Sequence, residues 1–315
     1  MFRRGFTAVG IVAVALFVSA IPASASAAPS AVSHPRIVAH FDVATGQQPE
    51  NILVEPGGVD LVFSRSFQVV RIGQDRRVRV LATLPTPADG GVNTPGLGFP
   101  IATGIARGAD GSLYVGFAAG SDDLTGVWRI RAGKKPQRVI PLTALSFPNG
   151  IDIDRRTGDV YVADSSRGII WRAPSGGGRP VAWSSAQELA PTTFFGANGL
   201  KVHDGAVWAS NLDRGTLLRI PLGWRGGRVE TRFTGKSGID DFAFVGHSVL
   251  AANNPNNEVV LIRPDGTSKT VLTAADGLQQ PTAVGIRGNT VYVTSAAYFS
   301  GQDPNLLVGY LRSEY

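Results

Sequence analysis

Six polar residues recur along the chain, each at the start of a short apolar run typical of a β-strand. They lie 42 to 53 residues apart, and we call them the anchors: Glu50, Thr103, Asn149, Asn198, Asp240 and Thr282. The set holds two carboxylic acids and two carboxamides but no histidine or thiol. An all-oxygen shell suits a hard cation, and Ca²⁺ more than Mg²⁺, because calcium accepts roughly six to eight oxygens in flexible geometry. Two clustered carboxylates would also repel each other unless a cation compensates. If a fold gathers the anchors, the predicted calcium ligands are Glu50, Asn149, Asn198 and Asp240.

Each anchor begins the first of four short predicted strands. A turn such as Asp110-Gly111 or Asp204-Gly205 leads to a second strand rich in Val and Tyr, as at 160–162. A third and a fourth strand follow, as at 127–130 and 228–230. Four short antiparallel strands repeated about every 40 to 50 residues are typical of a β-propeller. We therefore predict an all-β fold, a six-bladed β-propeller with four antiparallel strands per blade.

One outer strand is left over when the strands are assigned to blades in order. Residues 36–41, which precede the first anchor, have the pattern of a strand and could complete the last blade beside its third strand at 306–310. A ring closed in this way by an N-terminal strand hides edges that an open sheet would expose. In a propeller the first strand of each blade lines the axis, so the anchors are expected to form a ring around it.

Another interpretation exists for the two asparagines. Asn149-Gly150 and Asn198-Gly199 are dipeptides that often mark turns, so either asparagine taken alone is better explained as the entry to a loop. Four ligand-type residues in one register, each from a different blade, are harder to explain as turns. The constellation as a whole therefore favours a metal site.

The N-terminus and the composition limit the class of protein. Residues 1–28 combine Arg3 and Arg4, an apolar stretch and small residues, which predicts a secretory signal peptide and an exported protein. Residues 29–315 are then a single domain, with no membrane span after cleavage, and we expect a monomer. The chain has 315 residues, 43% hydrophobic and 17% charged, and no cysteine, which excludes a disordered chain and a disulfide scaffold. The formal net charge is +6, but the sequence contains no basic patch interleaved with aromatic residues, so nucleic acid is not an expected partner.

The anchor motifs resemble those of the six-bladed calcium propellers that include the gluconolactonase/regucalcin family, the paraoxonases and diisopropylfluorophosphatase. The resemblance covers the predicted domain as architecture, and four motifs carry it: Pro49-Glu50-Asn51, Phe147-Pro148-Asn149-Gly150, Ala197-Asn198-Gly199 and Ile239-Asp240-Asp241. The set is similar to that of diisopropylfluorophosphatase and the paraoxonases. Regucalcin-like gluconolactonases carry an aspartate, as ligand and base, where this chain has Asn198. The resemblance implies a calcium cofactor and Asp240 as the nucleophile or base.

The predicted chemistry is hydrolysis, in which Ca²⁺ polarises a carbonyl or phosphoryl oxygen and a carboxylate attacks or activates water. Asp240 or its neighbour Asp241 would act as that carboxylate, although Asp241 could equally be a supporting residue behind the ligands. Paraoxonases are understood to use a histidine near calcium, and none matches here. His203 and His247 stand next to turns that belong at the end of the channel opposite the anchors.

Loops on the anchor side would supply a mixed polar and aromatic rim, with Tyr298, Phe99, Phe194 and the segment 253–255 among its members. The first hypothesis is an exported calcium-dependent hydrolase of a small lactone, ester or phosphotriester. The alternative is a non-catalytic extracellular propeller that binds a protein or cell-envelope ligand and holds calcium only for its structure. A strictosidine-synthase-like or lyase activity is weaker, because no catalytic Glu or His can be placed for it.

Overall fold

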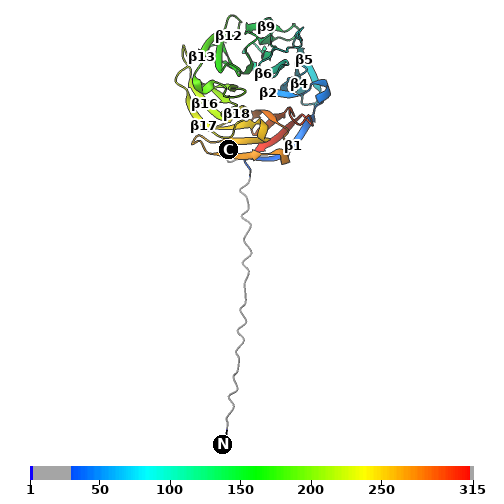
Figure 1. The fold of residues 1–315 in the computed structure, drawn as a ribbon. Helices are drawn as coiled ribbons and strands as arrows, with labels where there is room; N and C mark the ends of the chain where they lie inside the picture. The colour runs from blue at the N-terminus through cyan, green and yellow to red at the C-terminus, as the bar shows by residue number, and fades with distance from the viewer. Residues whose placement is uncertain (3–29, 313–315) are drawn as a thin grey trace.

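The computed structural model describes residues 1–2 and 30–312, and residues 30–312 form six four-stranded antiparallel sheets around a central axis (Figure 1). The predicted six-bladed β-propeller is therefore confirmed. The predicted signal peptide falls on residues that are almost all outside the described range, so it stays a prediction. Within residues 30–312 the helices are single 3₁₀ turns, and none has the length and apolar character needed to cross a bilayer.

The first three blades each consist of four strands consecutive in the chain. Blade 1 contains β2 (Pro49–Glu55), β3 (Gly58–Phe63), β4 (Gln68–Gly73) and β5 (Val78–Thr83). Blade 2 contains β6 (Ile101–Arg107), β7 (Leu113–Ala118), β8 (Gly126–Ile130) and β9 (Gln137–Pro141). Blade 3 contains β10 (Pro148–Asp154), β11 (Asp159–Asp164), β12 (Ile169–Pro174) and β13 (Val181–Ser184).

Blades 4 and 5 follow the same order, and blade 6 takes one strand from each end of the domain. Blade 4 contains β14 (Ala197–His203), β15 (Ala206–Asn211), β16 (Thr216–Pro221) and β17 (Glu230–Thr234). Blade 5 contains β18 (Ile239–Val245), β19 (Ser248–Asn253), β20 (Glu258–Ile262) and β21 (Ser268–Leu272). Blade 6 contains β22 (Pro281–Arg287), β23 (Thr290–Ser295), β24 (Asn305–Leu311) and β1 (Val32–His40). The 3₁₀ turns are η1 (Val43–Thr45), η2 (Gln187–Leu189), η3 (Asn254–Asn256) and η4 (Ala274–Asp276).

The turn dipeptides act as the sequence predicts. Between β14 and β15, Asp204 has φ 45° and Gly205 has φ 66°, the two positive values of a type I′ hairpin. Such a turn sets the register of the two strands that it joins. We call the end of the ring where the innermost strands begin the anchor face, and the other end the opposite face.

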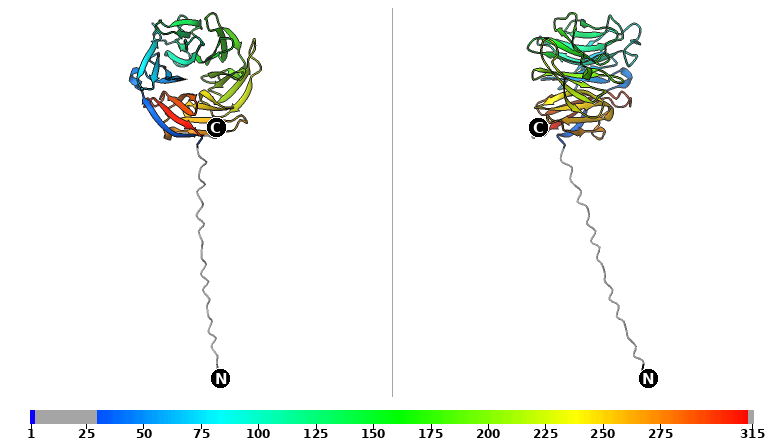
Figure 2. Two further views of the ribbon diagram at one scale, coloured as in Figure 1. Left: turned by 180° about the vertical axis from the view of Figure 1, so that it is seen from behind. Right: turned by 60° about the vertical axis from the view of Figure 1, so that its left-hand side comes forward.

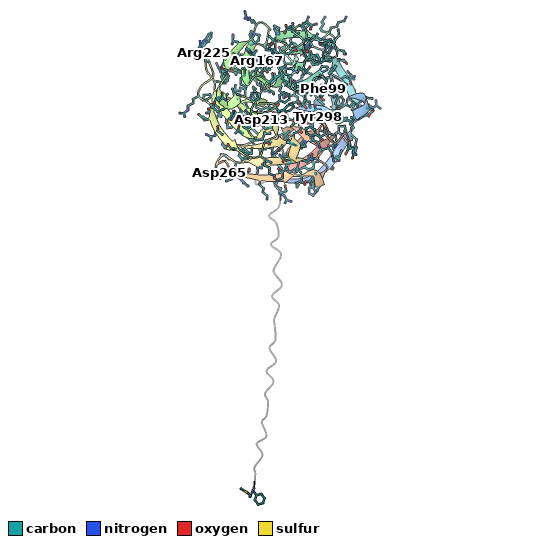
Figure 3. All side chains as sticks on the ribbon, viewed as in Figure 1. Phe99, Arg167, Asp213, Arg225, Asp265 and Tyr298 are labelled. Atoms are coloured by element: carbon teal, nitrogen blue, oxygen red, sulfur yellow. The ribbon has the colours of Figure 1, made fainter. Side chains whose placement is uncertain are left out.

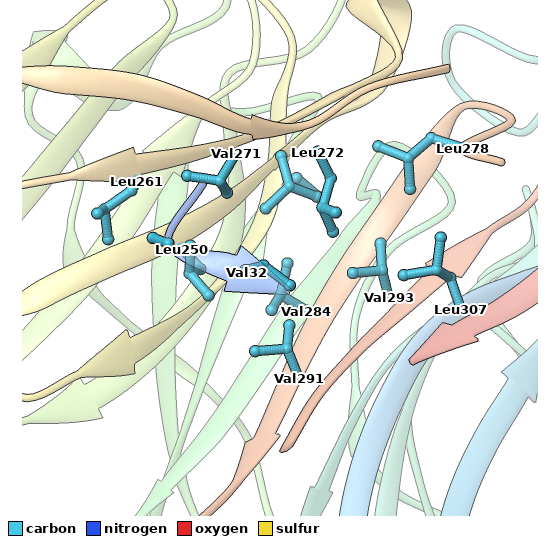
Figure 4. Packing of buried hydrophobic residues seen from close by; sticks show 13 residues of the cluster. Val32, Leu250, Leu261, Val271, Leu272, Leu278, Val284, Val291, Val293 and Leu307 are labelled. Atoms are coloured by element: carbon cyan, nitrogen blue, oxygen red, sulfur yellow. The ribbon is translucent and has the colours of Figure 1, made fainter. Parts of the chain in front are cut away.

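The ring closes where strands from the two ends of the domain pair. β1 runs antiparallel to β24, with Val32 opposite Leu311 and His40 opposite Asn305, and the two strands lie together in the view from behind (Figure 2). The predicted closing strand is therefore present, although it begins at residue 32 rather than 36. Blades 5 and 6 pack through a cluster of buried aliphatic side chains that includes Val32 and Leu250 (Figure 4). The closing strand thus stabilises the ring through hydrogen bonds and through apolar burial.

Candidate metal centre

Every innermost strand has a register shift at its anchor. In β10 the shift lies between Pro148 and Ile151 and encloses Asn149. The matching shifts in the other innermost strands enclose Glu50, Thr103, Asn198, Asp240 and Thr282. A β-bulge leaves a residue outside the ladder and re-aims its side chain, and such bulges are frequent next to active sites. The six anchors thus share a register, as predicted, and each also lies at a register shift of its strand.

Glycines after three anchors let neighbouring blades approach closely. A Cβ on Gly150 would lie 2.4 Å from the backbone oxygen of Asn198, and one on Gly199 would lie 2.5 Å from that of Asp240. Asn149-Gly150 and Asn198-Gly199 lie inside β10 and β14, so the interpretation of these dipeptides as turns is wrong. Their glycines, which have no side chain, allow neighbouring blades to approach closely near the axis.

The two threonine anchors fasten blades together. Thr103 donates its hydroxyl to the backbone oxygen of Pro148, at 2.7 Å, and Thr282 donates to that of Pro49, at 2.8 Å. Each acceptor directly precedes the anchor of the next blade. Thr103 and Thr282 therefore fix the positions of Asn149 and Glu50, and the four remaining anchors stay the candidate ligands.

The two acidic anchors are buried and influence each other. Glu50 is 6% exposed and Asp240 is 7% exposed. Burial raises the pKa of Glu50 to about 7, against the opposing effect of a 2.6 Å hydrogen bond from the Tyr298 hydroxyl to its Oε2. Burial, and then the negative charges of Glu50 and Asp241, hold the pKa of Asp240 well above its usual range. Bringing these acids together without a cation is costly, as the sequence predicted.

The amide anchors leave oxygens for a cation. Asn198 donates Nδ2 to Asp240 Oδ1 at 3.1 Å, while its own Oδ1 is buried and has no hydrogen-bond partner. The Asn149 side chain is buried and makes no hydrogen bond with the described residues. The unpartnered oxygen of Asn198, beside two carboxyl groups with raised pKa values, is the donor set that a hard cation requires. No group of three or more His, Cys, Asp or Glu side chains able to hold a metal occurs among the described residues, so a cation held here would need the amide oxygens as well.

Asp241 is committed to other partners. Both carboxylate oxygens accept from Lys201 Nζ, at 2.7 and 2.6 Å, and Oδ2 also accepts from Asn51 Nδ2 at 3.0 Å. Both oxygens of this buried carboxylate are therefore engaged by neighbouring donors and are less available to attack a substrate. The geometry therefore favours Asp241 as a supporting residue over Asp241 as the catalytic group.

An aromatic wall stands beside the anchors. Phe147 and Phe195 are buried with ring centroids 4.3 Å apart, and the Tyr298 side chain packs against this cluster. Asp213 accepts hydrogen bonds from the backbone N–H groups of residues 192–195, which hold the loop that carries Phe195. Burial raises the pKa of Asp213, but these hydrogen bonds together outweigh it and lower the pKa to about 2. Figure 3 shows Tyr298 and Asp213 toward the middle of the ring. The predicted rim thus combines aromatic rings with a hydroxyl, that of Tyr298, which bonds Glu50 directly.

Several contacts of the site were missed by reasoning from the sequence. Tyr298 and Asn254 were placed on the rim, yet Tyr298 bonds Glu50 and Asn254 donates to Asp240 Oδ2 at 3.1 Å. The ion pair of Lys201 with Asp241 was not predicted, although a lysine within the apolar strand Gly199-Leu200-Lys201-Val202 is a signal for such a pair. All four histidines lie away from the anchors: two are on β1, and His203 and His247 are on the opposite face, as predicted.

Comparison with known proteins supports the fold. No family model and no curated protein sequence matches the chain. Among solved structures, a gluconolactonase from Xanthomonas campestris matches with a TM-score of 0.62 at 13% identity, covering 92% of this chain and 99% of that one. The calcium-binding protein regucalcin from Agrobacterium tumefaciens matches with a TM-score of 0.63 at 14% identity, covering 87% and 94%. Virginiamycin B lyase from Staphylococcus aureus matches with a TM-score of 0.60 at 14% identity, covering 89% and 100%. The chain shares the six-bladed propeller of gluconolactonase- and regucalcin-like structures.

Proposed function

We propose that this protein is an exported calcium-dependent hydrolase of a small lactone, ester or phosphotriester, with the ion held by Glu50, Asn149, Asn198 and Asp240. The observation that carries the proposal is the buried, unpartnered Oδ1 of Asn198 beside two acids whose pKa values are raised. The similarity of fold to a gluconolactonase and to calcium-binding regucalcin supports it.

The side chains around the ring have different roles in the proposed reaction. Calcium, when bound, supplies a Lewis acid that stabilises negative charge on a carbonyl or phosphoryl oxygen. Asp240 is the nucleophile or the base, and the amides of Asn198 and Asn254 fix the orientation of its two oxygens. Tyr298 holds Glu50 in place through its hydroxyl. The aromatic wall of Phe147 and Phe195 excludes water from one side and favours substrates with an apolar portion.

The first experiment measures the metal content of the purified protein by elemental mass spectrometry after dialysis without chelator, together with the melting temperature with and without Ca²⁺. We expect about one or two calcium ions per chain and a gain of several degrees, because a ligand at 100 times its Kd stabilises by about 2.7 kcal/mol. No bound calcium and no thermal gain would overturn the proposal and leave the alternative, a propeller that binds an extracellular ligand.

The second experiment tests catalysis and export. In a screen of lactones, aryl esters and phosphotriesters, Asp240→Asn should retain the fold and lose turnover. Asp265→Asn, an equal change on an exposed turn, should keep full activity. Failure of the wild type to turn over any of these substrates while it binds calcium would restrict the ion to a structural role. Expression with the native N-terminus should give a secreted protein whose sequence begins near residue 29.

A further inference from the structure

Four blades carry an arginine at one register of their third strand, and three of these arginines are paired. Arg71 binds both oxygens of Asp60 at 2.6 and 2.7 Å. Arg172 contacts Asp159 at 2.7 Å, and Arg219 contacts Glu230 at 3.2 Å. These pairs tie together strands within a blade and neutralise the guanidinium.

Arg129, the arginine of blade 2, has no such partner. The positions that hold Asp60, Asp159 and Glu230 in the other blades are occupied in blade 2 by three uncharged residues, Tyr114, Ser112 and Gln137. Arg129 makes no hydrogen bond or ion pair with the described residues, and its Nε is buried without an acceptor. A buried donor on a permanent cation is costly to leave unsatisfied. Arg129 thus lacks the directly bonded acid that the equivalent arginines of blades 1, 3 and 4 have.

Arg129 lines a cavity of about 530 Å³ on the opposite face, between blades 2 and 3. Arg155, from the β10–β11 turn of blade 3, lines the same cavity and also makes no hydrogen bond or ion pair with the described residues. A third arginine, Arg107, is already paired with Glu55 and Asp60. The one acid in the lining is Asp110, whose carboxylate accepts from the backbone N–H and the hydroxyl of Ser112 and is also attracted by the charge of Arg129 without a hydrogen bond to it. The cavity therefore has a surplus of positive charge.

The remaining lining is suited to a polar organic molecule. Ser175, the ring of Tyr114 and the backbone of glycines 108, 158 and 176 complete the wall. Tyr114 directs its hydroxyl to the backbone oxygen of Ser175 at 2.9 Å, which braces the two blades across the cavity. The volume exceeds that of inorganic phosphate and lies in the range of pockets that hold small molecules.

We propose that this cavity binds a small soluble phosphate monoester, with Arg129 and Arg155 contacting its phosphate from two blades. One guanidinium satisfies the two oxygens of a planar carboxylate, whereas two guanidinium groups from different walls suit the three terminal oxygens of a tetrahedral phosphate. The site is independent of the calcium ring, because neither arginine contacts an anchor, and it stands or falls separately from the hydrolase function.

The test is isothermal titration of the metal-free protein in Tris chloride at constant ionic strength, with inorganic phosphate, glucose 6-phosphate and glucose as probes. We expect both phosphate probes to bind, glucose 6-phosphate at least as tightly as inorganic phosphate, and glucose not to bind. Vesicles containing phosphatidic acid test a lipid source of the same group. The proposal would be overturned if neither inorganic phosphate nor glucose 6-phosphate binds at about 10 mM, or if the protein binds only to the vesicles.

Variants separate the cavity from the general charge of this face. Arg129→Gln and Arg155→Gln should each weaken glucose 6-phosphate binding by at least about tenfold, because each removes a charge-assisted contact. Arg131→Gln is the matched control: Arg131 is exposed, follows β8 by one residue and bonds Gln137 instead of lining the cavity. Its affinity should stay within about twofold of the wild type. An equal loss in Arg131→Gln would assign the binding to diffuse charge and reject the site.

Discussion

Asn198 donates its side-chain amide to Asp240 Oδ1 at 3.1 Å, and this contact decides which atom of Asn198 is left over. Because Nδ2 is used, the buried Oδ1 is the atom without a partner. An aspartate at this position would add a third acid next to Glu50 and Asp240 and would remove a donor from Asp240. The asparagine therefore limits the electrostatic repulsion among the anchors in the metal-free protein while it still offers an oxygen to a cation.

Asn198→Asp should destabilise the metal-free protein but strengthen its binding of calcium. The metal-free protein should lose about 2 to 4 kcal/mol, because a third buried acid repels the other two. Calcium affinity should rise at least about tenfold, because the new carboxylate adds charge to the ligand set. Thermal melts with calcium and with chelator, and calcium titration, measure the two effects. A uniform loss of stability, with no gain in calcium affinity, would place Asn198 outside the metal site.

Stability of the metal-free protein should fall as pH rises from about 5 to 8. The pKa of Glu50 is about 7 in the folded state and 4.5 ordinarily, so the folded protein binds more protons in this window. The contribution of Glu50 is fully present below about pH 4.5 and is lost as pH rises through about 7, on the order of 3 kcal/mol. Glu50→Gln should reduce this slope in urea melts carried out with chelator, and the part that remains comes from Asp240, whose pKa burial also raises. A slope unchanged by the substitution would contradict the assignment.

Calcium binding near neutral pH should release protons. A Glu50 carboxyl that is about half protonated at pH 7 must ionise to become a ligand. Titration calorimetry in two buffers with different ionisation enthalpies should detect the release at pH 6.5, and much less of it at pH 8.5. Tyr298→Phe should increase the release at pH 7.5, because loss of the hydroxyl bond raises the pKa of Glu50 further. No buffer dependence at pH 6.5 would show that Glu50 is not a ligand.

Gly150→Ala should destabilise the fold far more than an alanine introduced at an unobstructed glycine. The added Cβ would lie 2.4 Å from both the Asn198 oxygen and the Leu200 nitrogen, which are backbone atoms that cannot move aside. We expect a loss of about 3 kcal/mol or more, together with weaker calcium binding, measured by denaturant melts and calcium titration. Gly176→Ala is the control, since nothing lies within 4 Å of its added Cβ. Equal effects of the two substitutions would refute the close approach of blades 3 and 4.

Lys201→Met should destabilise the protein by about 3 to 5 kcal/mol, because Asp241 would remain buried with its charge uncompensated. Adding Asp241→Asn should recover much of that loss. Lys236→Met, which breaks an exposed pair with Glu258, should cost under about 1 kcal/mol. Denaturant melts of these three variants and of Asp241→Asn alone, each compared with the wild type, measure the coupling. A Lys201→Met protein as stable as wild type would free Asp241 for the catalytic role again.

The spacing of the anchors was sufficient to predict the blades and the convergence of Glu50, Asn198 and Asp240, because each repeat is a local unit with its own turns. Contacts between distant repeats were not predictable in the same way. Tyr298 and Glu50 are 248 residues apart, and their hydrogen bond depends on the path of the β23–β24 loop. The bulges were likewise missed, since one residue left out of a ladder has no distinct sequence pattern of its own.

The ring closure also sets an order of events for folding. β1 is the first strand in the chain and its only neighbour in the sheet is β24, the last, so β1 has nothing to pair with until residues 305–311 arrive. Blades 1 to 5 each contain strands consecutive in the chain and can form as local units, whereas blade 6 must wait for a contact that spans the whole domain. Once that contact is made, opening the ring requires β1 and β24 to separate along their length. The pairing of β1 with β24 that delays completion of the fold should therefore also slow unfolding.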